Sequence, residues 1–354
     1  MEEIALMRRC LTLARRAVGR TSPNPMVGAL LYKDGRIIAE DYHRKAGSLH
    51  AEALVLNKAG AAAQGATLFV SLEPCCHTGK RTPPCVDAIV RAKVKRVVAA
   101  MADPNPAVSG KGLEMLKNSG IETEVGILHA DAKRLNEAYV KFITTRGIPF
   151  VTLKAAITLD GKMATPDGQS KWITCEKSRH YVHRLRGSVD AVLTAIGTVK
   201  ADNPRLTARI RGLKSPVRVV VDPYLQTPRD YEILKTPPQT IICTQEADTR
   251  GFPPGVEFIH YGCRLDLKWL MRELGQRQQI TSVLIEGGAS LTGHAIEDGI
   301  VDKVVFFIAP KIIGGKGVYS PVSSRSFRGI DSPYEVFDMK ARTLGTDIVI
   351  EGYL

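Results

Sequence analysis

The sequence predicts an α/β protein with two domains. At 354 residues, the chain is about twice as long as a typical single domain. Helical and strand-like patterns alternate along both halves, which is typical of α/β layers. Hydrophobic residues make up 44% of the chain and charged residues 24%, close to the averages of globular proteins. Each half is therefore long enough to bury a core of its own.

The first half is expected to begin with an amphipathic helix. Apolar residues recur at three- and four-residue spacing over 4–18, opposite basic residues, so this helix should pack on a sheet. Apolar runs at 27–32 and 35–39, on either side of Lys33-Asp34, predict a strand hairpin. Helical stretches that begin near His50, Pro84, Gly110 and Asp131 then alternate with strand-like runs at 66–72, 96–101 and 121–125.

A change of pattern marks the expected domain boundary. The helical pattern stops around 144–149 and a new strand begins at 150–157, so we predict domains at 1–147 and 148–354. Helices are expected in the second domain at 176–186, at 265–275 and after Gly288. Strands are expected at 191–194, 217–221, 240–243, 282–285, 303–309, 334–340 and 346–353.

Charge and composition narrow the expected partners and compartment. A net charge of +13 favours an anionic partner, such as a phosphorylated small molecule, a dinucleotide or a nucleic acid, although scattered surface Lys and Arg would also account for it. The first 20 residues are interrupted by charges and lack the apolar region of a signal peptide. No apolar run approaches the ~20 residues that cross a bilayer. We therefore expect a cytoplasmic protein without a membrane partner.

Three short motifs predict a catalytic zinc site: H-A-E at 50–52, E-P-C at 73–75 and P-P-C at 83–85. His50, Cys75 and Cys85 supply three protein ligands. The fourth position stays open for a water molecule, whose pKa a catalytic zinc lowers to about 7. Glu52 would then carry a proton from that water to the leaving amine, as in the H-x-E…P-C…C pattern of zinc-dependent base deaminases.

The spacing of the two cysteines departs from the common pattern. Nine residues separate Cys75 from Cys85, where two are usual, so Cys76 and His77 are alternative ligands. We favour Cys85, because the preceding prolines can place it in the first turn of a helix. A lone cysteine is often just a small buried apolar residue, but three cysteines, at 75, 76 and 85, lie close together in the sequence. The odd total of seven cysteines in a chain without a signal peptide argues against a disulfide framework. A purely structural zinc would normally take four protein ligands.

These motifs, with T-S-P-N-P-M-V-G-A at 21–29 and M-A-D-P-N-P at 101–106, closely resemble the bacterial bifunctional riboflavin-biosynthesis deaminase-reductase family. The likeness covers nearly the whole chain. It implies a cytidine-deaminase-like three-layer domain followed by a dihydrofolate-reductase-like domain. The implied enzyme uses zinc (Zn2+) to deaminate 2,5-diamino-6-(5-phosphoribosylamino)pyrimidin-4(3H)-one. It then uses NADPH to reduce the ribosyl group of 5-amino-6-(5-phosphoribosylamino)uracil to ribityl.

The resemblance also implies which residues bind the deaminase substrate: Asn24, His43, Lys80, Thr82 and Asp103. The loop between the two cysteines looks one residue longer than is usual in the family. Lys80 and Arg81 therefore both stay candidates for the family's basic position.

In the second domain the residues alone indicate less. L-I-E-G-G-A-S-L at 284–291 is a strand that opens through two glycines into a helix, whose free N–H groups suit a phosphate. The full G-x-G-x-x-G pattern is absent, and tight turns use the same glycines. The resemblance implies NADPH contacts at Ala156, Trp172, Thr198, Asp202, Gly288, Ala289, Ser290, Leu291, Thr292, Gly293 and His294. It implies substrate contacts at Ser170, Arg186, Leu206, Arg209 and Glu286.

Some roles in the reductase stay open. Arg186 and Arg209 suit a phosphate, although Arg186 lies in a basic helical run where a solvated role is common. Lys154 and Asp160 are candidates for the proton donor by location alone.

The main alternative is a deaminase that acts on nucleic acid, since such enzymes share the motif and are often basic. The wide cysteine spacing and a second domain of about 200 residues argue against it. We therefore predict a phosphorylated pyrimidine ribotide as the partner, with neither nucleic acid nor membrane. A homo-oligomer stays open.

Overall fold

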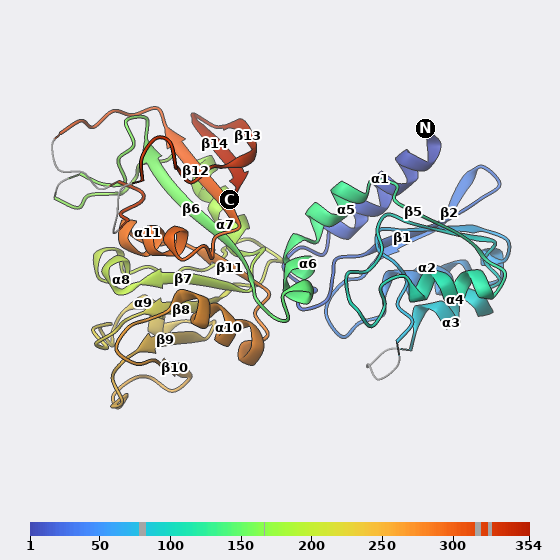
Figure 1. Cartoon of the computed structure of the whole chain (residues 1–354), viewed down its shortest axis with the longest axis horizontal. Helices are drawn as coiled ribbons and strands as arrows, with labels where there is room; N and C mark the ends of the chain where they lie inside the picture. The colour runs from blue at the N-terminus through green and yellow to red at the C-terminus, as the bar shows by residue number, and fades with distance from the viewer. Residues whose placement is uncertain (78–82, 166, 316–319, 325–327) are drawn as a thin grey trace. The chain divides into compact units, whose positions relative to one another are not determined.

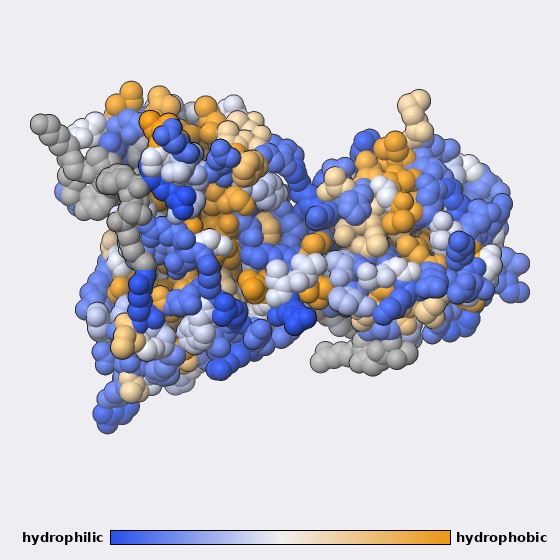
Figure 2. Space-filling view, viewed as in Figure 1, coloured by the Kyte–Doolittle hydropathy of each residue, from blue (hydrophilic) through white to orange (hydrophobic). Residues whose placement is uncertain are grey.

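The computed structural model describes residues 1–77, 83–165, 167–315, 320–324 and 328–354. The chain divides into two units, Met1–Gly147 and Ile148–Leu354, each built on one β-sheet (Figure 1). Hydrophilic residues dominate the visible face of both units, and apolar residues lie among them in smaller groups (Figure 2). Among the described residues, no helix combines the length and the apolar composition that crossing a membrane requires.

The first unit has a five-stranded sheet in the order β2-β1-β3-β4-β5. Its hairpin turns at Asp34 and Gly35, which both have positive φ, 49° and 74°, as a two-residue hairpin turn of the favoured type requires. β1 is antiparallel to β2 and β3, whereas β3, β4 and β5 are parallel to one another. The strands are β1 (Gly28–Lys33), β2 (Arg36–Tyr42), β3 (Thr67–Val70), β4 (Arg96–Ala99) and β5 (Glu122–Val125).

Helices cover both faces of this sheet and make three layers (Figure 1). The expected N-terminal helix, α1, packs on β1 and β3 and contacts α5, while α2 packs on β1 and β2 and contacts α3. The helices are α1 (Glu2–Arg15), α2 (Ala51–Ala59), α3 (Cys85–Arg91), α4 (Lys111–Asn118), α5 (His129–Leu135) and α6 (Glu137–Thr144), with a 3-10 turn at Gly60–Ala63. One continuous apolar cluster fills the space between the layers.

The second unit has a nine-stranded sheet in the order β10-β9-β8-β7-β11-β6-β12-β14-β13. The first seven strands are parallel, and only β14 runs antiparallel to its two neighbours. Central strands such as β9 and β11 are buried along their whole length, as expected where helices cover both faces of a parallel sheet. The strands are β6 (Phe150–Thr158), β7 (Ala191–Ala195), β8 (Val217–Val221), β9 (Thr240–Thr244), β10 (Val256–His260), β11 (Ser282–Ile285), β12 (Lys303–Ala309), β13 (Phe337–Leu344) and β14 (Asp347–Tyr353).

Helices again pack on both faces of the sheet. One core joins the sheet to α10 and α11, and a second core on the other face includes residues of α8 and α9. A smaller cluster joins α7 to β12 and β14. The helices are α7 (Glu176–Arg186), α8 (Ile196–Asp202), α9 (Glu232–Lys235), α10 (Leu267–Gln278) and α11 (Ala289–Glu297).

The predicted α/β class is confirmed, with local differences. The sequence analysis missed α8, α9 and β10. α8 is only seven residues long and contains Gly and β-branched residues, which are weak helix formers. The strand expected at 334–340 was misplaced: β13 begins at Phe337 and ends at Leu344. Apolar and polar residues alternate over 337–342, but they also alternate over Y-E-V at 334–336 just upstream, so the pattern does not set where the strand begins.

Candidate functional site

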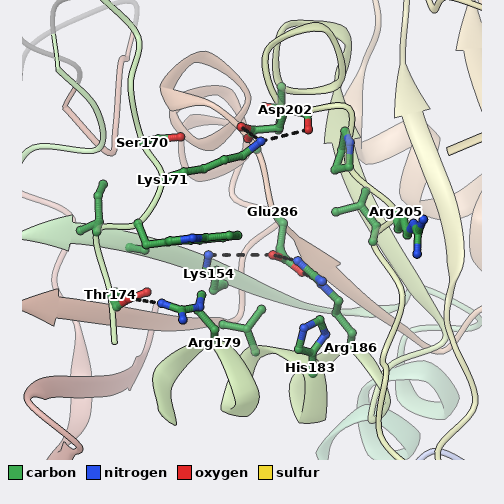
Figure 3. Close-up of a pocket in the computed structure, with 18 of the residues that line it drawn as sticks. Lys154, Ser170, Lys171, Thr174, Arg179, His183, Arg186, Asp202, Arg205 and Glu286 are labelled. Carbon is green, nitrogen blue, oxygen red and sulfur yellow. Dashed lines mark hydrogen bonds and ion pairs between the residues drawn. The ribbon is translucent and has the colours of Figure 1, made fainter. Parts of the chain in front are cut away.

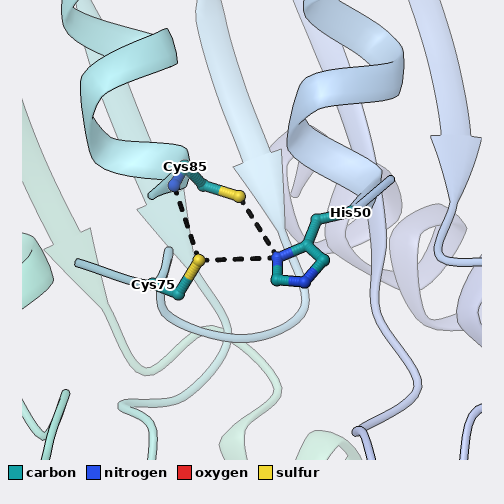
Figure 4. Close-up of side chains that lie close together, drawn as sticks. All are labelled: His50, Cys75 and Cys85. Carbon is teal, nitrogen blue, oxygen red and sulfur yellow. Dashed lines mark hydrogen bonds between the residues drawn. The ribbon is translucent and has the colours of Figure 1, made fainter. Parts of the chain in front are cut away.

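Three side chains of the first unit converge on one point. Nδ1 of His50 lies 3.4 Å from Sγ of Cys75 and 3.3 Å from Sγ of Cys85, and the three ligand atoms all lie within 4.8 Å of one another. The imidazole nitrogen faces both sulfurs (Figure 4). Ligand atoms that share a tetrahedral zinc at about 2.0–2.3 Å are themselves about 3.5 Å apart. The donor set and its spacing therefore fit zinc.

Two of the three residues stand at the start of a helix, and the third lies in the segment between β3 and α3. His50 immediately precedes α2, and Cys85 is the first residue of α3. Cys75 lies in the segment after β3, and its sulfur accepts the backbone N–H of Cys85 at 3.4 Å. The helix start expected at Cys85 is thus present. Glu52 lies in the first turn of α2 with only 3% of its surface exposed.

A second buried carboxylate holds the segment that carries Cys75. Glu73, 3% exposed, accepts backbone N–H groups from Asp103 at 3.0 Å, Gly110 at 2.9 Å, Gly112 at 2.9 Å and Leu113 at 3.2 Å. One side chain thereby ties the end of β3 to the segment that follows β4 and to the start of α4. The sequence analysis treated this residue only as part of a motif.

The described residues expected to bind the deaminase substrate lie beside this cluster. Nδ2 of Asn24 is 3.3 Å from Nε2 of His43, and the ring of His43 meets that of His50 edge-on at 5.3 Å. Asp103 accepts the hydroxyl of Tyr139 at 2.8 Å. Burial raises the pKa of Asp103. Lys80 and Thr82, and with them the choice between Lys80 and Arg81, lie outside the described residues.

The second unit contains a cavity of 620 Å³ at the carboxyl ends of its parallel strands (Figure 3). Ile285, the last residue of β11, pairs with Leu153 of β6, so β6 continues beyond the end of its neighbour. Lys154 and Ala156 lie on this extension, and Glu286 follows directly after β11. Ligands of open α/β sheets bind at this edge. The predicted residues that line the cavity are Ala156, Ser170, Trp172, Arg186, Thr198, Asp202, Leu206, Arg209 and Glu286.

Three charged groups meet inside the cavity. Arg186 contacts Glu286 through two parallel bonds, 2.6 Å from Nε to Oε1 and 2.9 Å from Nη2 to Oε2. Nζ of Lys154 lies 3.9 Å from Oε2 of the same carboxylate (Figure 3). Burial lowers the pKa of Lys154, and Glu286 only partly offsets this. The solvated role considered for Arg186 is thus wrong, because only 14% of its side chain is exposed.

The glycine-rich segment has two different environments. Gly288 directly precedes α11, and space next to it is open: an added Cβ would meet only Oγ1 of Thr198, at 3.8 Å. Ala289 and Ser290 form the first turn. Further along, Leu291 and Thr292 are buried, and a Cβ on Gly293 would meet the backbone oxygen of Ser323 at 2.1 Å. His294 lies in the second half of the helix.

Comparison with known proteins decides the family. Residues 149–350 match the model "RibD C-terminal domain", and residues 1–101 match "Cytidine and deoxycytidylate deaminase zinc-binding region". The riboflavin biosynthesis protein RibD of Aquifex aeolicus is 43% identical over 97% of this chain and 96% of its own length. RibD of Escherichia coli is 41% identical over 89% of each chain. The chain belongs to the RibD family.

Solved structures agree with this family. RibD of Acinetobacter baumannii matches with a TM-score of 0.90, 36% identity and coverage of 99% of this chain and 98% of that one. A deaminase-reductase of Thermotoga maritima matches with a TM-score of 0.90, 37% identity and the same coverage. Like its RibD relatives, the chain is a bifunctional deaminase and reductase of riboflavin biosynthesis, with a zinc-binding deaminase domain and an NADPH-dependent reductase domain. The predicted family, fold class and cofactors are confirmed.

In this RibD-family chain the cavity has further lining residues that the sequence analysis missed. Those with ionisable side chains are Lys171, Arg179, His183, Arg205 and Glu232. Arg179, Val182, His183 and Arg186 lie at helical spacing along α7 and all face the cavity. This spacing is visible in the sequence, but of these four residues the sequence analysis named only Arg186 as a binding residue. The other missed residues lie in loops or short helices and carry no periodic signal.

Proposed function

We propose that His50, Cys75 and Cys85 hold the zinc of the deaminase and that Glu52 moves the proton in that reaction. The spacing of the three ligand atoms is the observation that carries this assignment. Zinc, when bound, makes a water molecule acidic enough to act as a nucleophile at neutral pH. Glu52 is buried in the first turn of α2, two residues after His50, and can accept a proton there and return it to the leaving amine.

The substrate of this site is taken to be the diaminopyrimidine ribotide named above. His43 lies against His50 and Asn24 lies against His43, which supports a contact of both with the pyrimidine or its ribose. Asp103 is buried and held by Glu73 and Tyr139, which fixes the position of its second oxygen. The expected contacts of Lys80 and Thr82 belong to this proposal as well.

We assign reduction of the ribosyl group to the cavity of the second unit. NADPH supplies the hydride. The start of α11 suits one of its phosphates, because the space beside Gly288 is open and the first-turn N–H groups have no partner within the helix. Thr198, Asp202, Trp172 and Ala156 line the adjoining wall. Within 288–294, we expect direct contact from the first three residues, whereas residues 291–293 lie in the packed part of the helix and are expected to support it.

Lys154 is the better of the two proton-donor candidates. Its Nζ lies inside the cavity beside Glu286, where the new hydroxyl would form. Asp160 instead accepts bonds from Thr158 and from the backbone of Ile313 and Gly314, an arrangement that lowers the pKa of Asp160 to about 2. A carboxylate held in its ionised form is a poor acid.

The test is an assay of the full chain with the diaminopyrimidine ribotide, zinc and NADPH, in which ammonia release and NADPH oxidation are followed separately. Both signals are expected. After removal of zinc with a chelator, ammonia release should stop while NADPH oxidation on supplied aminouracil ribotide continues. Ammonia release alone would restrict the proposal to the first unit. Deamination of tRNA or DNA, which we do not expect, would favour the nucleic-acid alternative.

A homo-oligomer is part of the proposal. β13 is the edge strand of the second sheet, and its Phe337 and Met339 are 58% and 62% exposed. An exposed edge with apolar side chains is a template for pairing with a second copy. Sedimentation of the full chain tests this, and a monomer at micromolar concentration would contradict it.

A further inference from the structure

The loop that carries Arg209 has an unusual backbone. Leu206 and Arg209 both have positive φ, 51° and 53°, a conformation that residues other than glycine rarely adopt and that surrounding contacts must maintain. Both residues line the cavity. Between these two residues, the backbone oxygen of Thr207 accepts hydrogen bonds from side chains of α7.

Two side chains of α7 bind that oxygen. Nδ1 of His183 lies 3.1 Å from the oxygen of Thr207, and Nη1 of Arg186 lies 3.4 Å from it. A carbonyl oxygen only accepts hydrogen bonds, so Nδ1 of His183 carries the proton in this contact. The hydroxyl of Thr207 in turn accepts from Nε of Arg209 at 3.2 Å. A chain of contacts therefore leads from His183 through Thr207 to Arg209.

Of the three arginines at this end of the cavity, Arg209 is the one whose charge is not compensated by a carboxylate of the described residues. The guanidinium of Arg186 is bound by Glu286, and that of Arg205 by Glu232 at 2.7 Å. Across the described parts of the chain, no carboxylate lies within ion-pair distance of Arg209. Partial burial and the nearby Arg186 and Arg205 lower the pKa of Arg209. An anion placed here would relieve that repulsion, and a phosphate fits a guanidinium fork.

His183 does not supply a charge of its own. Burial lowers the pKa of His183, and the neighbouring Arg186 and Arg209 lower it further against the opposing effects of Thr207 and Glu286. The ring is therefore neutral at neutral pH. His183 therefore acts on a bound anion indirectly, through its contact with Thr207 in the loop that carries Arg209.

We propose that His183 is a positioning residue which, through the backbone of Thr207, holds Arg209 against the phosphate of the ribotide. The inference rests on the proposed reductase function and deepens it, because it separates the roles of two arginines. Arg186 orders Glu286 and the loop, whereas Arg209 binds the phosphate. Phosphorylated substrates would then depend on His183, and substrates without the phosphate would not.

The test uses the full chain with NADPH and supplied aminouracil ribotide. His183→Leu removes the N–H donor and keeps the apolar bulk, whereas His183→Gln keeps an N–H that can reach Thr207. His180→Leu, on the exposed side of the same helix, is the matched control. We expect His183→Leu to raise KM for the ribotide about tenfold, the size of one lost hydrogen bond, with kcat changed less than about twofold. His183→Gln should restore most of the affinity, and His180→Leu should match the wild type.

Two further measurements separate positioning from a general structural role. With the dephosphorylated substrate, His183→Leu and the wild type should have equal KM. In an Arg209→Ala background, His183→Leu should have no further effect, since the interaction it supports is already gone. Equal losses on both substrates, or full additivity with Arg209→Ala, would overturn the inference.

Binding of ribose 5-phosphate, followed by calorimetry, gives a readout without turnover. We expect it to weaken about tenfold in His183→Leu and to stay unchanged in His180→Leu. Unchanged binding in His183→Leu would contradict the inference even if reduction itself were lost. Absence of reduction by the wild-type chain would instead contradict the proposed function. Unchanged thermal unfolding of the second unit, which carries the substitutions, is the check that each variant is folded.

Discussion

Glu286 stands between two cations in the cavity of the second unit: it forms a bidentate pair with Arg186, and its Oε2 lies 3.9 Å from Nζ of Lys154. Burial opposes ionisation of this carboxyl, but the two cations outweigh it and hold the pKa of Glu286 below its usual range. The three groups carry a net charge of about +1, so the loss of the carboxylate leaves two buried cations without compensation.

Glu286→Gln should therefore destabilise the second unit markedly. Removing one partner of a buried pair costs about 3 kcal/mol, because the other charge stays buried. The measurement is urea unfolding of the full chain, followed by a probe in the second unit. Glu232→Gln is the control, since its partner Arg205 is 56% exposed and a pair at the surface contributes less than about 1 kcal/mol. Equal effects of the two changes would contradict this account of the cavity.

Glu52→Gln should abolish deamination while zinc stays bound. The substitution keeps the shape of the side chain, but an amide cannot accept and return a proton. Metal analysis measures the zinc content. Ammonia release is measured with the diaminopyrimidine ribotide, and NADPH oxidation is measured with supplied aminouracil ribotide. A loss of about a hundredfold or more in ammonia release is expected, with reduction unchanged. Loss of zinc would mean that Glu52 supports the metal site, and loss of both activities would mean that the two units are coupled.

Much of the fold and of the zinc site could be predicted from the sequence, because the signals are local. The H-A-E and P-P-C motifs place His50 and Cys85 at helix starts, and both helices are present. The pairing of Glu286 with Arg186 could not be predicted, since 100 residues separate them and only the strand order of the sheet brings them together. The same holds for His183 and Thr207, whose contact depends on a loop with positive φ.

Gly112→Ala should destabilise the first unit and weaken zinc binding. Alanine is favoured over glycine inside a helix by about 1 kcal/mol, but a Cβ at this position would lie 2.2 Å from the backbone oxygen of Pro74 and 3.1 Å from Oε1 of Glu73. Pro74 precedes Cys75, so we expect relief of the clash to move a proposed zinc ligand.

The clash should outweigh helix propensity and give a net loss of about 1–3 kcal/mol. Thermal unfolding and zinc competition with a chromophoric chelator measure the two effects. Gly262→Ala is the control, because no atom lies within 4 Å of an added Cβ there and its φ is not in the left-handed region. A stabilised Gly112→Ala variant with normal zinc affinity would contradict this packing.

If Lys154 donates the proton in the reduction, the reaction should slow at high pH. Burial lowers the pKa of Lys154, and the attraction of Glu286 does not fully restore it. The protonated form that donates is present below this lowered pKa and is lost as pH rises through it. The rate of reduction should therefore fall at a lower pH than the pKa of an ordinary lysine would give.

Single-turnover NADPH oxidation from pH 6 to about 10 measures this decline. Lys154→Met should lower the rate by about a hundredfold and remove the decline, while Lys154→Arg, which stays protonated over the whole range, should also lack it. A decline that persists in both variants would exclude Lys154 as the donor.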